Sequence, residues 1–202
     1  MKRAFLGIVL ALLPSTASAD DTEVAHEGLY VRVTGGFAGS LTTLQKADGS
    51  GSTITHGTGG AFQLMIGGTP TEGLAVGVLG AMPHGGGVKA SGVGAGSLSL
   101  SLLGLFGDYY PDATGSVHFG GAVGYGIANY AGGDGVSRGV GGLAFAGYDL
   151  WFGDNWSLAL MLQLHGQLGW GNDKPFGDSQ SYKLSGVNLV AGGSLQVGIL
   201  FN

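Results

Sequence analysis

In the stretch Ser157-Leu158-Ala159-Leu160-Met161-Leu162-Gln163-Leu164-His165, every second residue is leucine. A period of two places the leucines on one face of a β-strand and the other side chains on the opposite face. Charged residues are only 10% of the chain, whereas soluble domains contain about 25%. Similar alternation returns in further segments from residue 28 to the last residue. Apolar strand faces without charges are typical of strands in contact with lipid, so the pattern predicts a transmembrane β-barrel.

The N-terminus has the parts of a secretory signal peptide. Lys2 and Arg3 precede an apolar run over residues 4–13, and Ala17-Ser18-Ala19 supplies the small residues of a cleavage site. The run is too short for a membrane-spanning helix, which needs about 20 residues. We therefore expect cleavage after Ala19, with a signal peptide over 1–19, a short periplasmic segment over 20–27 and a barrel domain over 28–202.

The composition argues against several classes of protein. The chain has no Cys, which excludes disulfides, thiolate metal sites and Cys nucleophiles. Its formal net charge is −5, and loss of Lys2 and Arg3 with the signal would make it more negative, so we expect no nucleic-acid partner. Glycine accounts for 44 of 202 residues, yet without a three-residue repeat or low hydropathy this indicates neither collagen nor disorder. Small residues at alternate positions, as in Gly120, Ala122 and Gly124, fit the interior of a narrow barrel.

The alternating segments divide into about eight strands, each near the roughly 9–11 residues needed to cross a bilayer at a tilt. The predicted strands cover residues 28–39, 60–69, 74–82, 97–106, 116–128, 142–152, 156–170 and 183–201. Short connections are predicted at 70–73, 107–115 and 153–155, and long ones at 40–59, 83–96, 129–141 and 171–182. The predicted fold is an all-β, single antiparallel up-and-down transmembrane barrel with short periplasmic turns and long extracellular loops. An even strand number places both termini in the periplasm.

Aromatic residues gather near the predicted strand ends. Those nearest the short turns are Tyr30, Phe106, Tyr109, Tyr110, Trp151, Phe152, Trp156 and Phe201. Those toward the long loops are Phe37, Phe62, Tyr130, Trp170 and Tyr182. Amphipathic rings collect at both interfaces of a membrane, so we predict two aromatic girdles; ordinary core aromatics are the alternative.

With these features the chain resembles the small bacterial outer-membrane β-barrel superfamily, including the eight-stranded transmembrane barrels of the OmpA and OmpX type. The last strand carries part of this resemblance, because Val197, Ile199 and Phe201 alternate toward a C-terminal aromatic residue. The resemblance implies that the barrel-assembly machinery recognises this strand. Asn202 departs from the pattern, since it makes the aromatic residue penultimate. No peptidoglycan-binding domain follows the barrel, so a cell-wall tether is not implied.

Side chains alternate between the inside and the outside of the barrel along each strand, and this strand parity predicts a polar network inside the barrel. Arg32 and Asp149 fall on the inward face at similar depth, so we expect an ion pair with His118 and Gln196 nearby. A second inward layer nearer the outside contains Gln163, His165, Gln167 and Asn188. An interior of eight strands is about filled by side chains. We therefore interpret the network as lumen filling, with a selectivity constriction as the alternative.

No constellation in the sequence predicts catalysis, a cofactor or a metal. His165 is followed two residues later by Gln167 instead of the Ser found in lipid-editing barrels, and its parity turns it inward. Gly135-Val136-Ser137-Arg138-Gly139 matches the nucleophile-elbow string but lies in a Gly-rich region without the required strand-turn-helix setting. The five histidines lack metal-ligand spacing.

These patterns predict an integral protein of the Gram-negative outer membrane with a structural or surface-interaction role and no enzymatic chemistry. The expected partners are outer-membrane lipid and, during biogenesis, the assembly machinery; the sequence names no surface ligand. A narrow passive channel for small solutes or ions is the alternative, and an enzyme acting on outer-leaflet lipid is a more distant one.

Overall fold

The computed structural model describes residues 28–90, 93–130, 134–176, 182–184 and 186–202. The predicted signal peptide with its cleavage at Ala19, and the segment 20–27, lie outside the described residues. The strands are β1 (Gly28–Lys46), β2 (Ser52–Thr71), β3 (Leu74–Ala90), β4 (Val93–Tyr109), β5 (Val117–Tyr130), β6 (Gly135–Trp151), β7 (Trp156–Gly171), β8 (Pro175–Phe176), β9 (Tyr182–Lys183) and β10 (Val187–Phe201). Among the described residues, no helix is long and apolar enough to cross a membrane.

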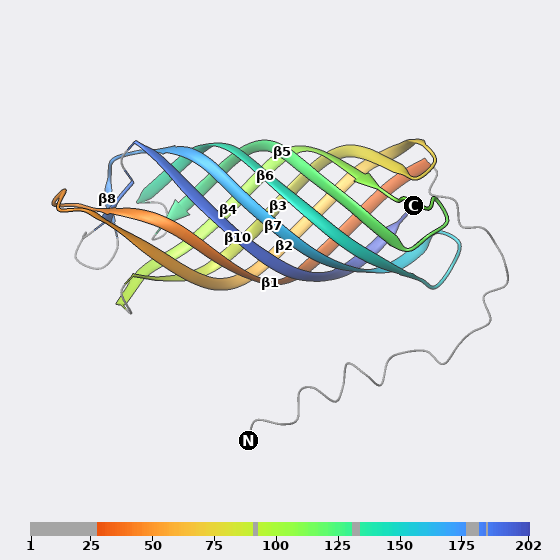
Figure 1. Cartoon of the computed structure of the whole chain (residues 1–202), viewed down its shortest axis with the longest axis horizontal. Helices are drawn as coiled ribbons and strands as arrows, with labels where there is room; N and C mark the ends of the chain where they lie inside the picture. The colour runs from red at the N-terminus through yellow and green to blue at the C-terminus, as the bar shows by residue number, and fades with distance from the viewer. Residues whose placement is uncertain (1–27, 91–92, 131–133, 177–181, 185) are drawn as a thin grey trace, which may run out of the picture.

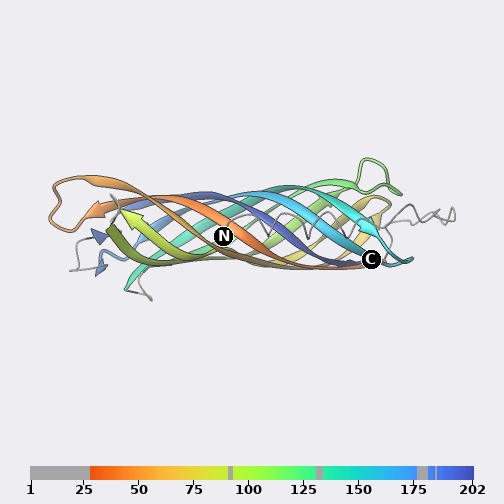
Figure 2. The same ribbon diagram turned by 90° about the horizontal axis from the view of Figure 1, so that it is seen from below.

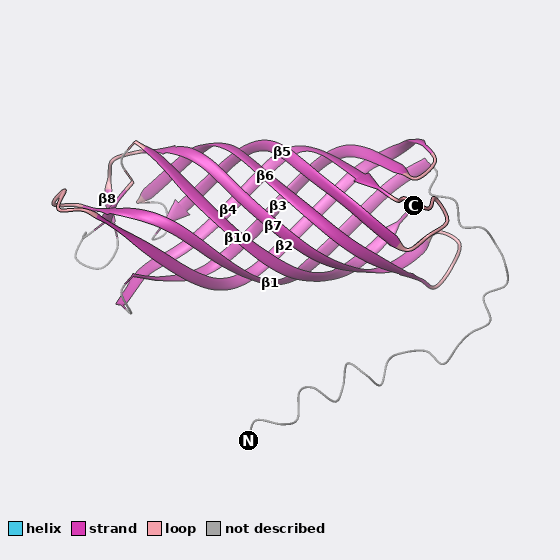
Figure 3. Cartoon of the chain, viewed as in Figure 1, coloured by secondary structure: helices cyan, strands magenta, loops and turns pink. Residues whose placement is uncertain are grey.

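The long strands close into a barrel (Figures 1 and 2). Each of β1 to β6 pairs antiparallel with the next strand, β7 pairs with β10, and β10 pairs with β1, from Val31↔Phe201 to Thr42↔Val190. The two-residue strands β8 and β9 form a side hairpin against the end of β1. The fold is therefore a closed antiparallel up-and-down barrel of eight long strands within the described residues, and the predicted fold class is confirmed (Figure 3).

The strands run further than the sequence predicted. The segments 40–59, 83–96 and 129–141 were expected as long loops, but most of their described residues belong to strands, and the connections are 47–51, 91–92 and 131–134. Only the connection 172–186, which contains β8 and β9, is long at that end. The loop prediction is wrong for the first three segments because hydrogen-bonded pairing continues where the apolar alternation ends, as in Thr43↔Ile54 and Leu44↔Thr53.

The two faces of each strand meet different surroundings. On β7, Leu158, Leu160, Leu162 and Leu164 are between 38% and 66% exposed on the outside, whereas Ala159, Met161 and Gln163 are at most 1% exposed. Apolar residues are exposed in the same way on every long strand, for example Val33 on β1, Leu103 on β4 and Val123 on β5. The barrel therefore carries an apolar belt on its outside, as a lipid-embedded barrel requires.

Glycine makes room inside this narrow barrel. A Cβ atom added at Gly147 would overlap the His118 ring, and one added at Gly120 would overlap the Phe145 ring. His118 is opposite Gly147 in the β5–β6 register, and Asp108 is opposite Gly120 in the β4–β5 register. Large inward side chains therefore lie over glycines of the neighbouring strand.

Candidate functional site

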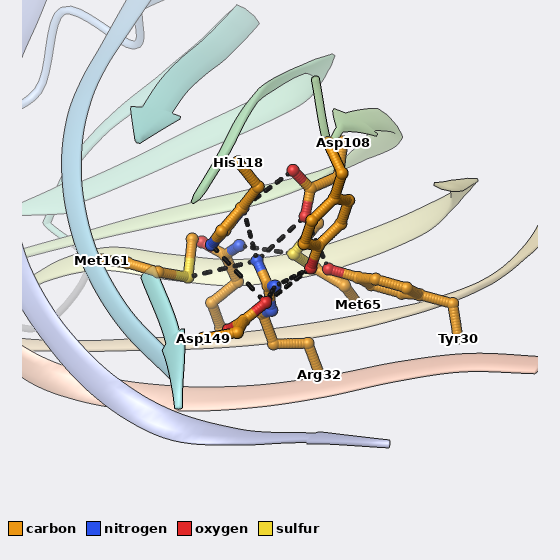
Figure 4. Close-up of polar contacts among 9 residues, drawn as sticks. Tyr30, Arg32, Met65, Asp108, His118, Asp149 and Met161 are labelled. Atoms are coloured by element: carbon orange, nitrogen blue, oxygen red, sulfur yellow. Dashed lines mark hydrogen bonds and ion pairs between the residues drawn. The ribbon is translucent and has the colours of Figure 1, made fainter. Parts of the chain in front are cut away.

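A buried group of ionisable side chains occupies the lumen toward the end of the barrel that holds the C-terminus (Figures 1 and 4). We call it the ion cluster; its members are Arg32, Asp108, His118 and Asp149, with the hydroxyls of Tyr30 and Tyr110. Arg32 Nη1 lies 2.9 Å from Asp108 Oδ2 and Arg32 Nη2 lies 2.8 Å from Asp149 Oδ2. All four ionisable side chains are 0% exposed. The guanidinium of Arg32 thus bridges carboxylates from two different strands, β4 and β6.

Further hydrogen-bond donors surround the two carboxylates of the ion cluster. Tyr30 Oη donates to Asp108 Oδ2 at 2.7 Å, and Tyr110 Oη donates to Asp149 Oδ2 at 2.6 Å. His118 Nδ1 lies 2.9 Å from Asp108 Oδ1, so the tautomer with its proton on Nδ1 donates to that carboxylate. Two carboxylates face one guanidinium, and these donors supply further hydrogen bonds to both carboxylates. A buried carboxylate needs such partners because leaving one uncompensated is costly.

Sequence reasoning identified only part of the ion cluster. The structure brings together Arg32, Asp149 and His118 as the shared parity and depth of their strands suggested. It adds Asp108, because β4 continues to Tyr109 where the sequence predicted a turn over 107–115. The missed signal is that Asp108 has the same inward parity as Phe106.

Gln196 does not join the ion cluster. It accepts a hydrogen bond from Thr34 Oγ1 at 2.5 Å and donates to Gln163 Oε1 at 3.3 Å and to Ser194 Oγ at 2.9 Å. Its register partner on β1 is Gly36, four residues further along that strand than Arg32. Gln196 therefore belongs with Gln163, one layer further into the barrel.

The other residues of the predicted second layer are buried but do not form one network. Gln167 Nε2 donates to the Ser137 carbonyl oxygen at 3.2 Å, and Asn188 Oδ1 accepts from Ser137 Oγ at 2.6 Å. His165 has no hydrogen-bond partner in the described part of the chain, and neither has His84, which a β-bulge in β3 brings to the inside. Buried polar atoms normally have a partner, so the middle of the lumen is where ordered water belongs.

A second packed group fills the opposite end of the lumen. We call it the outer plug; it consists of Leu44, Leu98, Leu100, Ala128, Tyr130, Leu184 and Val190, all at most 2% exposed. Leu184 comes from the connection between β9 and β10 and packs inward. Tyr130 Oη lies 2.8 Å from Thr42 Oγ1. The lumen is thus packed with side chains at both ends.

The prediction of aromatic girdles is wrong for four residues. Tyr30, Phe106, Tyr110 and Tyr130 are at most 5% exposed and pack inside the barrel. Trp151 and Tyr182 are partly buried against the same interior groups. The position of a residue along its strand determines the depth of its side chain in the barrel, whereas its parity determines whether the side chain points inward or outward. Tyr30 has the same parity as Arg32, so its side chain points inward. The remaining members lie on the outside: Phe37, Phe62, Tyr109, Phe152, Trp156, Trp170 and the half-buried Phe201.

The described residues contain no group of three or more His, Cys, Asp or Glu side chains that could hold a metal ion. The ion cluster is instead held together by its own contacts. Arg32 supplies the central cation, and the carboxylates around it are engaged by Arg32, His118 and the two tyrosines.

Comparison with known proteins adds information about the fold. No family profile and no curated protein sequence matches the chain. Among solved structures, the outer membrane protein OprG from Pseudomonas aeruginosa matches with a TM-score of 0.51 and 13% identity, over 88% of this chain and 97% of that chain. The chain has the fold of the small outer-membrane β-barrels.

Two further solved structures agree. Neisserial surface protein A matches with a TM-score of 0.50 and 16% identity, over 86% of this chain and 96% of that chain. The outer membrane protein AlkL, determined in lipid bilayers, matches with a TM-score of 0.50 and 13% identity, over 93% of each chain. At these identities the likeness concerns the fold, and the resemblance stated from the sequence is confirmed at that level.

Proposed function

We propose that this protein is a sealed integral barrel of the outer membrane, with a structural or surface-interaction role and no catalytic chemistry. The ion cluster is the observation that carries the proposal. Arg32 reaches carboxylates on β4 and β6 from β1, and every ionisable member is fully buried. A passage for ions would require these contacts to separate, which leaves buried charges without partners and costs about 3–5 kcal/mol.

The outer plug supports the same proposal from the other end. Its members are apolar, with Tyr130 tied to Thr42, and they include Leu184 from the long connection. An apolar constriction excludes ions because they would lose hydration there. A solute would have to pass both the ion cluster and the outer plug.

Burial also argues against an enzyme. The pairing of His118 with Asp108 at 2.9 Å has the form of a catalytic dyad, but both side chains are 0% exposed. A general base must come within hydrogen-bond reach of its substrate. The dyad is therefore better explained as part of the interior packing.

A narrow passive channel is the second candidate, and a specific observation favours it. His84 and His165, together with Gln63 Oε1 and Gln163 Nε2, present buried polar atoms without hydrogen-bond partners in the described chain. Such atoms call for water. A hydrated middle section would conduct if both ends opened.

Single-channel recording in planar lipid bilayers tests the proposal. We expect no current steps from the refolded protein or from Leu184→Gly, which opens only the outer plug. Combining Leu184→Gly with Arg32→Ala opens both ends and is expected to conduct. Refolding of each variant is checked by its β-sheet circular dichroism and by heat-dependent migration on gels. Reproducible current steps from the unmodified protein would overturn the sealed barrel in favour of the channel.

The proposal includes the cellular setting. Both the first described strand and β10 have their free ends at the same end of the barrel, which we assign to the periplasm. The partners are outer-membrane lipid around the apolar belt and the assembly machinery acting on β10, where Val197 and Ile199 face outward. Export through the signal peptide completes this assignment.

A further inference from the structure

The basic side chains of the barrel are concentrated at one end. Apart from Arg32 in the lumen, the described Lys and Arg residues all lie at the end that carries β8: Lys46, Lys89, Arg138, Lys174 and Lys183 (Figure 1). The three turns at the opposite end carry only acidic charges among the described residues, namely Glu72, Asp112 and Asp154. The β8 end therefore meets its surroundings with more cations than the other end.

Two of these cations share a cavity. A cavity of about 430 Å³ on the β6–β7 side is lined by Val136, Arg138, Trp170, Gly171, Asn172 and Lys174. Other cavities at this end carry one lysine each, Lys183 in one and Lys89 in another. Neither Arg138 nor Lys174 forms an ion pair with a described carboxylate. The cavity thus presents two cations that have no ion-pair partner among the described residues.

The backbone around the cavity is held in place. Asn172 Oδ1 accepts from the Val136 amide at 3.1 Å, and Asn172 Nδ2 donates to the Asp134 carbonyl oxygen at 3.1 Å. The Asn172 amide also donates to the Val136 carbonyl oxygen at 3.0 Å. These bonds tie Asn172, two residues before Lys174, to the start of β6, so the backbone that carries Lys174 is held beside β6.

The register places this cavity at the edge of the apolar belt. Arg138 is opposite Trp170, and the next outward pair toward the middle of the barrel is Val140 opposite Leu168. Val140 and Leu168 are 59% and 51% exposed, so the lipid-facing surface begins next to the cavity, on its side toward the middle of the barrel. Trp is a residue typical of the membrane interface, where lipid headgroups lie.

We propose that this cavity, which we call the rim site, binds the phosphate group of a membrane lipid headgroup. Arg138 supplies a guanidinium fork that matches phosphate oxygens, and Lys174 supplies a second cation. Trp170 lies beside them with its indole at headgroup level, and the lipid tails continue along Val140 and Leu168. A lipid is the source of the phosphate because the rim site opens where the apolar belt ends. The rim site depends on the barrel being in a membrane but not on whether its lumen conducts.

Native mass spectrometry of the refolded barrel, released from detergent with defined lipids, tests the rim site. The probes are phosphatidic acid and a diacylglycerol with the same chains, which lacks only the phosphate. We expect the unmodified protein to retain phosphatidic acid in preference to diacylglycerol. Arg138→Gln combined with Lys174→Gln should lower that retention at least about tenfold, the factor expected for one lost charge-assisted hydrogen bond.

A matched variant controls for overall charge. Lys46→Gln combined with Lys89→Gln removes the same charge from the same end and leaves the rim site intact. We expect this variant to retain phosphatidic acid as the unmodified protein does. Equal losses from both double variants would overturn the rim site in favour of a diffuse charge effect. Displacement of the lipid by millimolar inorganic phosphate would overturn it in favour of a site for soluble phosphate.

Discussion

Arg32 on β1 and Asp149 on β6 make a direct contact across the interior of the barrel, with Nη2 2.8 Å from Oδ2, although they are 117 positions apart in the chain. The two strands are not neighbours in the sheet, because β10 and β7 lie between them on one side and β2 to β5 on the other. The contact therefore crosses the lumen instead of following a hydrogen-bonded ladder. The two walls of the barrel are linked through the side chains of the ion cluster.

Removal of charges from the ion cluster should reveal this coupling. Arg32→Met leaves Asp108 and Asp149 without their cation, and we expect a loss of about 3–5 kcal/mol in the free energy of unfolding. Asp149→Leu should cost less, because Arg32 keeps Asp108 at 2.9 Å. The double variant should lose less than the two single losses combined. Urea titration of refolded protein measures the cycle, and strictly additive losses would contradict a contact.

The depth of an outward residue should decide the cost of a charge there. Leu164 lies outward near the middle of β7, so Leu164→Arg should cost about 2–4 kcal/mol in lipid vesicles. Val187 is also exposed but is opposite Trp170 at the end of the belt, so Val187→Arg should cost about 0–1 kcal/mol. The comparison uses equilibrium unfolding from bilayers. Equal costs at the two positions would show that the belt does not end at Trp170.

The room that glycine makes for His118 can be tested with one methyl group. A Cβ atom at Gly147 would overlap the His118 ring, so Gly147→Ala should cost about 1–3 kcal/mol through overpacking. Gly80→Ala is the matched control, since no heavy atom lies within 4 Å of its added Cβ. We expect that variant to unfold as the unmodified protein does. A silent Gly147→Ala would mean that His118 does not lie over Gly147.

Protease added to intact cells tests the orientation. Lys46 is the last residue of β1 and borders the turn 47–51, whereas Lys89 and Arg138 lie within β3 and β6 and Lys174 precedes Pro175, a bond that trypsin does not cut. Trypsin should therefore cut after Lys46 first. Cleavage is mapped by mass spectrometry of the released fragments. Replacing Lys46 by Gln should slow the first cut strongly, whereas replacing Lys174 by Gln should leave it unchanged. If cutting begins only after the outer membrane is breached, the β8 end faces the periplasm and the proposed orientation is wrong.

The last strand should matter more for assembly in cells than for stability. Phe201→Ser is expected to lower the amount of protein in the outer membrane several-fold, because the aromatic end of β10 is the proposed recognition signal. Its refolding in detergent should be affected little, since Phe201 lies outward with its ring edge-on to Trp156 at 5.0 Å. Phe152→Ser, at the same end but outside β10, is the control. Equal effects in cells and in detergent would contradict recognition of β10.

The sequence predicted the parts of the site that follow from parity along a single strand. Arg32, His118 and Asp149 each alternate with outward apolar residues, so their inward direction could be deduced without a structure. Asp108 lies beyond the predicted end of its strand at Phe106, where the apolar alternation gives way to Gly and Tyr, so the sequence did not predict it as part of the site. The position of Tyr30 near a strand end predicts a girdle residue, but its parity with Arg32 turns its side chain inward.

The sequence by itself determined that this chain forms a two-faced antiparallel barrel, because a period of two and a scarcity of charge are local properties of each strand. The tertiary structure decided which inward side chains meet. That depends on the register of every strand pair and on closure through β1 and β10, which bring Arg32 to both Asp108 and Asp149 but leave Gln196 in the next layer. Closure also decided how the lumen is filled, since Leu184 packs against Leu44 and Leu98 only once the barrel is complete. These contacts depend on the pairing of all the strands together, so they cannot be predicted from any single segment of the sequence.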